Sequence, residues 1–400
     1  MKKLCAMLLC FSMMFLTGCA CWDEKEMNEI GIVTGIAIDK DAQTNHYQIT
    51  LQVILPGNMQ KNQENNKKPY KDISSEGDTF FSAQRKLSQK YERSPFYSHN
   101  GLIIVDEAVA REGMNNILDF FTRDIESRDN MLLAVAKDTK ARDVLDYDNK
   151  TERIPSIALS KFDNVSFRNP GSVYKTLLDF NQSCYAYGMD PLLGIFSLTP
   201  EMNSLQTQTG TQSADGQQTD INYAGSAVFA FDKFQGFLSE DETTAYNFAA
   251  GKIKSAVVNV NGLQDQNSLI TTQVLCEHSH IEPHFNGSEI SFDINISDVS
   301  NIDEVHDDTD VTDIDVIAKL EEEHNEKVKA LVEELLNKTQ TEYKSDILGL
   351  GQSFYKKYPR QWEKIKNNWP EIYPTVRCNV IVKSTLVRTG MTNNKNKAEY

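Results

Sequence analysis

The segment IGIVTGIAI, residues 30–38, is the stretch on which the fold assignment depends. Its nearly continuous apolar run is typical of a buried strand, and Gly31 and Gly35 allow close packing against it. The charged triplet at 39–41 predicts a turn, after which residues 46–55 (HYQITLQVIL) return as an antiparallel partner. The sequence therefore predicts a β-hairpin at the start of the folded part.

Strands and helices alternate after this hairpin. A polar segment, residues 58–71, predicts a surface loop. From Thr79 to Lys90 the apolar residues recur with helical spacing, and Asp78 or Thr79 is placed to cap the first turn. The next elements are predicted at 101–105 (strand), 108–122 (helix) and 131–136 (strand). This alternation predicts an α/β or α+β domain.

A polar tract divides the sequence near its middle. Residues 203–220 (NSLQTQTGTQSADGQQTD) offer almost nothing to bury, which indicates a linker or a long loop. Beyond it we expect a strand at 225–231, a helix at 239–251, and a β-rich stretch at 253–296 with a hairpin turn at Asn286-Gly287.

One long helix is predicted in the C-terminal half. The acidic segment 303–315 ends in Thr312-x-x-Asp315, a capping-box pattern. After it, apolar and small side chains recur every three or four positions on one helical face, while Glu and Lys fill the opposite face. The residues on the predicted buried face are Val316, Leu320, His324, Val328, Leu331, Leu335 and Thr339.

The elements together predict a multi-domain α+β protein with mixed sheets, packed helices and one long helix in the C-terminal half. A length of 400 residues suits two or three domains. The predicted division is 1–18 (leader), 19–202 (N-terminal α+β domain), 203–222 (linker or loop), 223–300 (β-rich middle domain) and 301–400 (C-terminal domain with the long helix and a final strand).

The N-terminus predicts the compartment. Lys2 and Lys3 precede an uncharged apolar run, residues 4–16, which is the length of a signal-peptide core and too short to span a bilayer. The run ends in Leu16-Thr17-Gly18-Cys19, the lipobox pattern, in which the cysteine sulfur takes the diacylglyceryl group. We therefore predict cleavage before Cys19 and lipid attachment to it, which holds the mature chain at the outer face of a membrane. Cys21 is a rival acceptor with a poorer lipobox.

Charge and cysteine use exclude several classes of protein. The net charge of −16 becomes more negative once the leader and its two lysines are removed, so phosphate backbones would be repelled and nucleic acid is not a predicted partner. Cys184, Cys276 and Cys378 are far apart and form no CxxC pair, which argues against a disulfide framework and a zinc ribbon.

Possible catalytic and metal sites are weak. His278 and His280, with Cys276 on the same face of a strand, could hold zinc, but Pro283 ends the strand pattern and solvated histidines are the simpler interpretation. The aspartates at 307–315 do not match the EF-hand pattern. No G-x-S-x-G, H-E-x-x-H or Walker motif is present. We predict no catalytic residues, no metal and no cofactor. The five aromatic side chains most consistent with helix packing are Tyr355, Tyr358, Trp362, Trp369 and Tyr373.

Several segments, in order along the chain, carry a family resemblance. Cys21-Trp22-Asp23-x-x-Glu26-x-Asn28 precedes Ile32-Val33-x-Gly35-x-x-Ile38-Asp39, and residues 99–128 read HNGLIIVDEAVAREGMNNILDFFTRDIESR. The next matching segment is Gly225-Ser226-Ala227-Val228-Phe229, with Gly236 and Leu238 after it. The matching segments near the C-terminus are Lys344-Ser345-Asp346-Ile347-x-Gly349-x-Gly351, Tyr358-Pro359-x-x-Trp362, Trp369 and Arg388-Thr389-Gly390. These segments resemble the Ger(x)C family, the lipoprotein C subunits of spore nutrient-germinant receptors.

The resemblance implies a receptor subunit with no catalytic residues. Family members are three-domain α+β proteins on the outer leaflet of the spore inner membrane, alongside a membrane-embedded A subunit and a permease-like B subunit. The complex senses amino acids, sugars or nucleosides and triggers the release of ions and dipicolinate. The family usually places its tryptophan directly after the lipid-bearing cysteine; here Ala20 and Cys21 intervene, although the lipobox still favours Cys19.

The C-terminal motif also has a physical interpretation. Gly349 and Gly351 are expected to end the long helix, and Pro359 to begin the next. Trp362 and Trp369, seven positions apart, would then share one face of that helix, as fold determinants or as partner contacts.

The leading hypothesis is a lipid-anchored, non-enzymatic C subunit of a germinant receptor. The alternative is a solute-binding lipoprotein of a transporter, which would normally show two similar α/β lobes. A surface metalloenzyme built on His278 and His280 is the third possibility.

Overall fold

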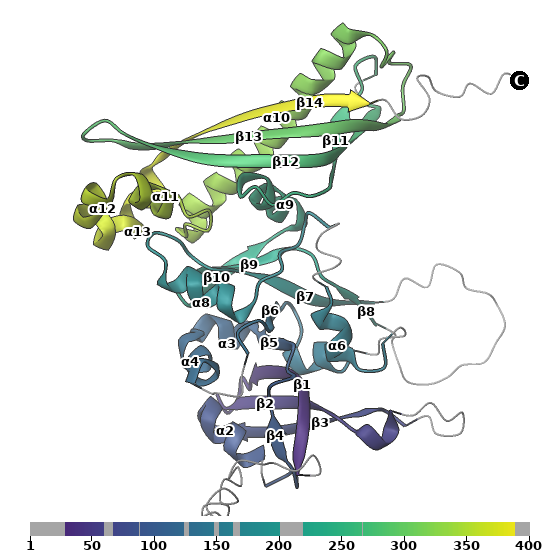
Figure 1. Cartoon of the computed structure of the whole chain (residues 1–400), viewed down its shortest axis with the longest axis vertical. Coiled ribbons are helices and arrows are strands. Elements are labelled where there is room, and N and C mark those ends of the chain that lie inside the picture. The colour runs from purple at the N-terminus through teal and green to yellow at the C-terminus, as the bar shows by residue number, and fades with distance from the viewer. Residues whose placement is uncertain are drawn as a thin grey trace, which may run out of the picture.

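The computed structural model describes residues 29–59, 67–87, 89–123, 128–147, 152–162, 169–200, 219–265 and 267–388. Within them the chain forms two sheets at opposite ends of an elongated molecule (Figure 1). The first sheet, built mainly from the N-terminal half, lies at the lower end, and the second sheet lies at the upper end.

The first sheet has the order β10-β9-β7-β6-β5-β1-β2-β3. Its centre is parallel, because β1, β5, β6 and β7 run in the same direction, and both flanks are antiparallel. The strands are β1 (Ile30–Lys40), β2 (Tyr47–Ile54), β3 (Tyr70–Gly77), β5 (Leu102–Asp106), β6 (Leu132–Ala136), β7 (Leu192–Pro200), β9 (Ser226–Ala230) and β10 (Lys233–Leu238), with β4 (Ser94–Phe96) beside β1 and β8 (Thr219–Asn222) beside β7.

Helices cover both faces of this sheet because its central strands alternate between two apolar faces. Ile38 lies on one face and Ala37 on the other, and each belongs to a separate hydrophobic core. The first face packs against α2 (Phe80–Leu87), α3 (Glu107–Glu112), α4 (Asn115–Arg123) and α8 (Leu177–Tyr185). The second face packs against α5 (Ala141–Leu145) and α6 (Pro155–Ser160).

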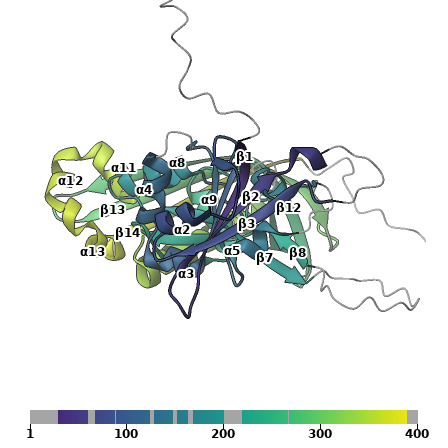
Figure 2. The same cartoon turned by 90° about the horizontal axis from the view of Figure 1, so that it is seen from below.

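The second sheet has the order β11-β12-β13-β14, with strands β11 (Ala256–Asn261), β12 (Leu269–Phe285), β13 (Ile290–Val305) and β14 (Arg377–Arg388). One face packs against α9 (Glu240–Ala249) and the long helix α10 (Ile314–Lys338). At one end lie α11 (Leu350–Lys357), α12 (Pro359–Ile365) and α13 (Trp369–Ile372), which project to one side when the molecule is viewed from below (Figure 2).

The α+β class, with mixed sheets and a long helix in the C-terminal half, is confirmed. The predicted hairpin is β1–β2, with Ile38 opposite Ile49. The other predicted strands correspond to β5, β6 and β9, and the turn at Asn286-Gly287 joins β12 to β13. The helix predicted from Ser239 is α9, and Ser239 forms its capping box with Glu242.

Five local predictions are wrong. The helix predicted at 108–122 is two helices, because Gly113 has a φ of 127° and ends α3. The N-cap of α10 is Asp313, whose side chain accepts a hydrogen bond from the Asp315 N–H, instead of Thr312. The loop predicted at 58–71 ends before Tyr70, where the edge strand β3 begins. This strand is rich in polar residues, so the hydrophobic pattern did not indicate it.

The fourth error concerns the glycines after the long helix. That helix ends at Lys338, and a single π-helical turn, Thr339–Tyr343, follows. Gly349, with a φ of 70°, precedes α11 and Gly351 lies inside it, so neither glycine ends α10. Pro359 does begin α12 as predicted. The fifth error is the prediction that Trp362 and Trp369 share one face of that helix, because Trp369 begins a separate helix, α13.

The polar tract does not separate the two sheets. Residues 203–218 of the predicted linker lie outside the described residues, and 219–222 form β8. On either side of the tract, β7 and β9 pair with each other in the first sheet, Leu193 opposite Ala227. The second sheet begins only at Ala256, so the sheets divide the chain later than the predicted boundary at 223. The three-domain division itself stays a prediction.

Candidate functional site

The predicted lipid site, Cys19, lies outside the described residues, as does Cys21. The first described strand, β1, belongs to the end of the molecule farthest from the second sheet (Figure 1). Among the described residues no helix is long and apolar enough to cross a membrane.

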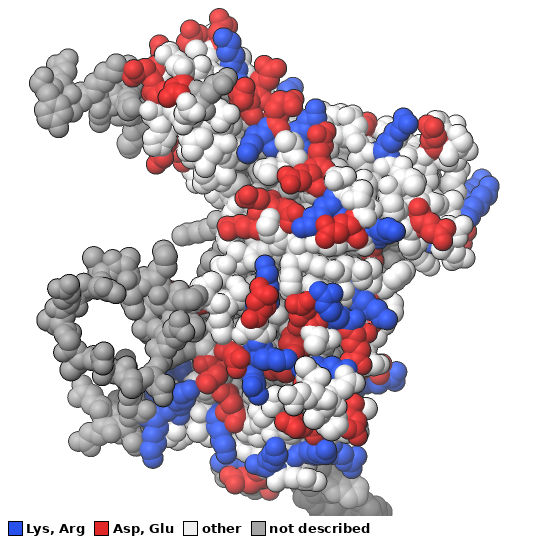
Figure 3. Space-filling model, turned by 180° about the vertical axis from the view of Figure 1, so that it is seen from behind, with Lys and Arg blue, Asp and Glu red and all other residues white. Residues whose placement is uncertain are grey.

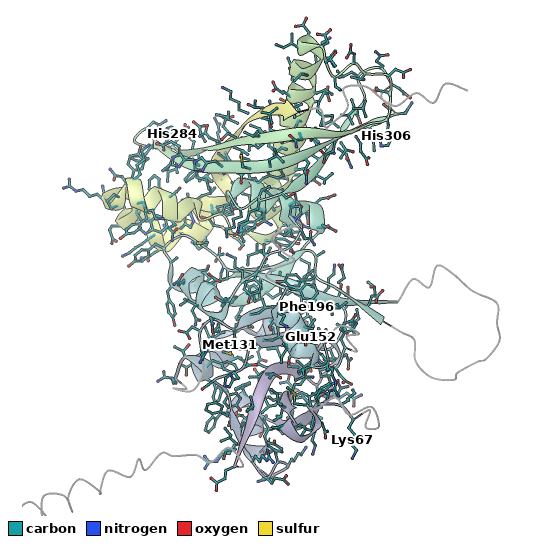
Figure 4. The ribbon with its side chains drawn as sticks, turned by 45° about the vertical axis from the view of Figure 1, so that its right-hand side comes forward. Lys67, Met131, Glu152, Phe196, His284 and His306 are labelled. Atoms are coloured by element: carbon teal, nitrogen blue, oxygen red, sulfur yellow. The ribbon has the colours of Figure 1, made fainter. Side chains whose placement is uncertain are left out.

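The histidines do not converge on one site. His280 Nε2 lies 3.0 Å from Glu282 Oε2, and Glu282 also pairs with Lys357. Figure 4 shows His284 and His306 at opposite ends of the long β12–β13 hairpin. In the described part of the chain no group of three His, Cys, Asp or Glu side chains is placed to hold a metal ion.

The acidic segment before α10 is a series of turns closed by its own side chains. Asp307 accepts a hydrogen bond from the Thr309 N–H at 3.0 Å, and Asp310 accepts one from Thr312 N–H at 3.0 Å. Carboxylates used in this way stabilise local turns, so these residues are explained without a bound cation.

Two carboxylates organise the carboxyl ends of the parallel strands. Asp106 accepts a hydrogen bond from the Val109 N–H at 2.9 Å, which caps α3. It also accepts one from Lys140 Nζ at 2.7 Å, which joins it to the loop before α5. Asp39 accepts hydrogen bonds from the backbone of Ala141 and Arg142. Burial, with the neighbouring Asp106, raises the pKa of Asp39 to about 6. These acids hold the first sheet to α3 and α5.

The motif that carries the family resemblance near the C-terminus folds around one buried carboxylate. Asp346 is 2% exposed. Its Oδ1 accepts a hydrogen bond from the Leu350 N–H at 2.9 Å, and its Oδ2 accepts bonds from the Gly351 N–H at 2.8 Å and from Trp369 Nε1 at 3.0 Å. One side chain therefore starts α11 and fixes α13 against it.

The backbone of Asp346 binds the first half of the chain. Its N–H donates to Asp190 Oδ2 at 2.8 Å, and its carbonyl accepts from the Asp190 N–H at 2.9 Å. The other oxygen of Asp190, Oδ1, accepts a bond from the Phe231 N–H at 2.9 Å in the turn between β9 and β10. We name Asp190, Phe231 and Asp346, with the backbone groups that they bind, the Asp346 junction.

Glycines permit the close approach at this junction. Gly188 has a φ of 60°, and a Cβ placed on it would come within 2.6 Å of the Gly351 Cα and of the Trp362 ring. A Cβ on Gly351 would come within 2.6 Å of Trp369 Nε1. Gly188 and Gly351 are therefore required by contact between the two halves of the chain.

Further contacts extend the junction along β9 and β10. The Ser345 hydroxyl donates to the Phe229 carbonyl at 2.6 Å, and the Tyr343 hydroxyl donates to the Phe237 carbonyl at 2.8 Å. Lys338 Nζ, at the end of α10, pairs with Glu242 at 2.7 Å. The last strands of the first sheet are thus tied to the end of the long helix.

Burial dominates the electrostatics of the junction. It raises the pKa of Asp346 to about 7, against the lowering effect of the N–H donors, and it also raises the pKa of Asp190. Because every Asp346 oxygen accepts a hydrogen bond from a buried donor, removing the carboxylate would leave those donors unpaired. The arrangement acts as a structural clamp.

Aromatic rings pack beside the clamp, as the sequence predicts. The rings of Trp362 and Trp369 lie 5.4 Å apart although they belong to different helices, and Tyr373 lies 6.4 Å from Trp369. All three are buried, while Tyr355 and Tyr358 are partly buried against them. This contact supports fold determination as the role of the tryptophans.

Sequence reasoning missed Asp190 and Gly188. They lie in a short segment after α8, and the contact between Asp190 and Asp346 joins residues 156 positions apart. No periodic pattern marks such a contact; the positive φ of Gly188 is the one local property that a sequence could have indicated.

Comparisons with known proteins agree with this architecture. The family model described as "Spore germination protein N-terminal domain" matches residues 23–198, and that described as "Spore germination B3/ GerAC like, C-terminal" matches residues 224–390. The two matches flank the polar tract and together include the Asp346 junction.

Similar proteins come from Bacillus subtilis (strain 168). Spore germination protein KC is 28% identical over 409 residues, with 100% of this chain and 98% of the relative covered. Spore germination protein B3 is 26% identical, with 91% and 93% covered.

A solved structure shares the fold. The crystal structure of the GerBC protein matches with a TM-score of 0.55 and 21% identity, covering 88% of this chain and 97% of that chain. The two family models, which match residues 23–198 and 224–390, show that the chain belongs to the Ger(x)C family of spore germination proteins.

Proposed function

We propose that this chain is a lipid-anchored, non-enzymatic C subunit of a spore nutrient-germinant receptor. The observation that carries the proposal is the match over the whole chain to spore germination protein KC. Because the relative is covered almost completely as well, the similarity extends to its full arrangement and is not limited to one module.

The anchor follows from the lipobox. We assign the lipid to Cys19, and the protein to the outer face of the spore inner membrane. The residues from Ala20 to Ile30 span at most about 40 Å when extended. The first sheet would then face the membrane and the second sheet would point away from it, as the position of β1 in Figure 1 suggests.

A non-enzymatic role is consistent with the use of the buried acids. Each of these acids accepts hydrogen bonds from backbone groups that begin a helix or join two segments; the acids are Asp39, Asp106, Asp190 and Asp346. Acidic and basic side chains are interspersed over the face shown in Figure 3. The proposed partners are the membrane-embedded A and B subunits and lipid bound through Cys19, without nucleic acid.

A solute-binding lipoprotein is less consistent with the fold. Such proteins have two similar lobes, whereas in the part of the chain that the structure describes the two sheets have ten and four strands.

The test is nutrient-triggered germination, measured as dipicolinate release. The gene is deleted in a spore-forming strain from which other genes of the family have been removed, so that no related receptor compensates. We expect the nutrient response to be lost and a receptor-independent trigger to remain effective. An unchanged response to every nutrient that the parent strain recognises would refute the proposal.

A further inference from the structure

A cavity of about 400 Å³ opens between α4, α8 and the turn that joins β9 to β10. We call it the α4–α8 pocket. Its lining includes Asn116 and Asp119 from α4, Asn181 and Tyr185 from α8, and Phe231 and Asp232 from the turn. Three segments that are distant in the sequence therefore form its wall.

The aromatic part of the wall is held open to solvent. Phe231 has a φ of 56°, a conformation that is uncommon and strained for a bulky residue, and it is 64% exposed. Tyr185 is 85% exposed. The Phe231 N–H binds Asp190, which is joined to Asp346, so the junction maintains this strained turn. Exposed aromatic rings beside a cavity are typical of a recognition surface.

The polar part of the wall is acidic. Asp119 and Asp232 contribute carboxylates, and none of the lining side chains that the structure describes is Lys or Arg. Arg123 Nε donates to both oxygens of Asp119 at 2.8 Å from the next turn of α4, which offsets much of the charge of that carboxylate and makes Asp232 the main negative group of the wall. Asp232 Oδ2 accepts a bond from the Asn115 N–H at 3.1 Å. The negative field also contributes, after burial, to the raised pKa of Cys184, about 12.

The pocket also contains amides with spare hydrogen-bonding capacity. Within the described residues the side chains of Asn116 and Asn181 make no hydrogen bond, and both border the pocket. Each supplies a carbonyl oxygen that accepts from an N–H donor. The carboxylates and aromatic faces attract a positively charged group, and the amide oxygens accept from its N–H donors.

We propose that the α4–α8 pocket binds an organic cation, a primary ammonium or guanidinium group on a short apolar arm. The charged group lies near Asp119 and Asp232, and the arm contacts Tyr185 and Phe231. The same chemistry is offered by a free amine and by a lysine or arginine side chain of a partner protein. This binding goes beyond the proposed receptor role and does not depend on it.

The test is a titration of the purified full chain with small probes, in which binding is detected by saturation-transfer difference NMR. The probes are n-butylammonium and n-butylguanidinium, with butyrate and 1-butanol as isosteres of opposite and zero charge. We expect the two cations to bind with a dissociation constant of about 1–10 mM, as suits so few atoms, and the isosteres to bind at least about tenfold more weakly.

Two substitutions at exposed positions test the site without disturbing the core. Asp119→Asn should weaken butylammonium binding about threefold to fivefold, because it removes a partly screened charge. Tyr185→Ala should weaken it about twofold to fivefold, because it removes an exposed cation–π contact. The matched controls are Asp241→Asn, which makes the same charge change in α9, and Ile314→Ala, which removes a side chain that is 79% exposed on α10. Both controls should bind as the parent does.

A second arm distinguishes the source of the cation. Blocked tripeptides Gly-Lys-Gly and Gly-Arg-Gly are compared with Gly-Glu-Gly. Tighter binding of the basic peptides than of the butyl probes supports a partner side chain, and weaker binding supports a free amine. The proposal is overturned if butyrate binds as well as butylammonium, if no cation binds below about 50 mM, or if both pocket variants bind as the controls do.

Discussion

The first sheet lies between two layers of helices, whereas helices cover one face of the second sheet. All five residues of β5 and of β6 are buried, while β11 alternates between buried and exposed positions. Val257, in β11, is 60% exposed, and Ile381, in β14, is 43% exposed. Parallel strands covered on both sides need continuous apolar runs, and a sheet that is solvated on one side needs alternation.

The difference in burial between the two sheets indicates which regions contribute most to the stability of the chain. The two halves do not fold as separate layers, because residues of β7 and β9 share a hydrophobic core with α9, α10 and the second sheet. The Asp346 junction adds buried hydrogen bonds at the same boundary. We therefore expect the first sheet and the junction to be the most sensitive regions, and the open face of the second sheet to be tolerant.

The largest expected effect is at the junction. Asp346→Ala leaves three buried N–H donors without a partner and should lower the free energy of unfolding by about 3–5 kcal/mol. Urea unfolding followed by circular dichroism measures the change. Asp190→Ala removes the acceptor of the Phe231 and Asp346 N–H groups and should lower the free energy of unfolding by less, about 1–3 kcal/mol. A loss below about 1 kcal/mol for Asp346→Ala would show that the clamp is unimportant.

The second prediction compares the sheets directly. Leu133→Ala, in the fully buried strand β6, should cost about 3 kcal/mol of unfolding free energy because it leaves a cavity between the sheet and the helices on its first face. Val257→Ala, on the open face of the second sheet, should change it by less than about 0.5 kcal/mol. Similar losses for the two variants, measured by the same urea titration, would contradict the assignment of an open face to the second sheet.

The third prediction concerns pH and the second sheet. Burial, with the nearby Asp298 carboxylate, raises the pKa of Glu277 from 4.5 to about 7. The folded chain therefore binds this proton more tightly than the unfolded chain does, and the resulting stability is present below pH 4.5 and lost as the pH rises through 7.

Glu277→Gln should consequently leave stability unchanged at pH 4.5 and raise it at pH 8. Allowing for solvent screening of a half-buried group, we expect a gain of about 1–2 kcal/mol. Thermal unfolding of both proteins at the two pH values measures it. A difference that does not depend on pH would contradict the assigned shift.

The smallest expected effect is at a helix terminus between the two sheets. Ser239→Ala removes the side chain that accepts from the Glu242 N–H and should cost about 1 kcal/mol. Ser239→Asp is the matched control, because it keeps an acceptor at the N-cap. Equal melting temperatures for the alanine variant and the parent would exclude a role for this cap.

Local periodicity explains most of what could be predicted. β5 and β6 are short apolar runs, and α10 repeats its buried positions over 25 residues, so both signals are strong. β3 lacks such a signal, because it is an edge strand with polar residues. The helix is divided because Gly113 has a φ of 127°. The residues on either side keep helical spacing, so the sequence pattern did not indicate the break.

The functional assignment came from motifs and from family-specific segments, not from periodicity. Composition and motifs indicate a lipoprotein without an enzyme motif, and the scattered family segments indicate the receptor family. The role of Asp346 as a clamp was not predictable, because its partners come from Asp190, Gly351 and Trp369, which meet only in the folded chain. The α4–α8 pocket depends in the same way on three distant segments.

The most direct test of the proposed role is dipicolinate release from spores in which Cys19→Ala replaces the natural residue, with the related receptor genes removed. We expect the variant chain to leave the membrane fraction and the spores to lose their nutrient response, while a receptor-independent trigger still works. Spores of this variant that germinate with nutrients as the parent does, with the chain still in the membrane fraction, would contradict both the lipid site and the anchored subunit.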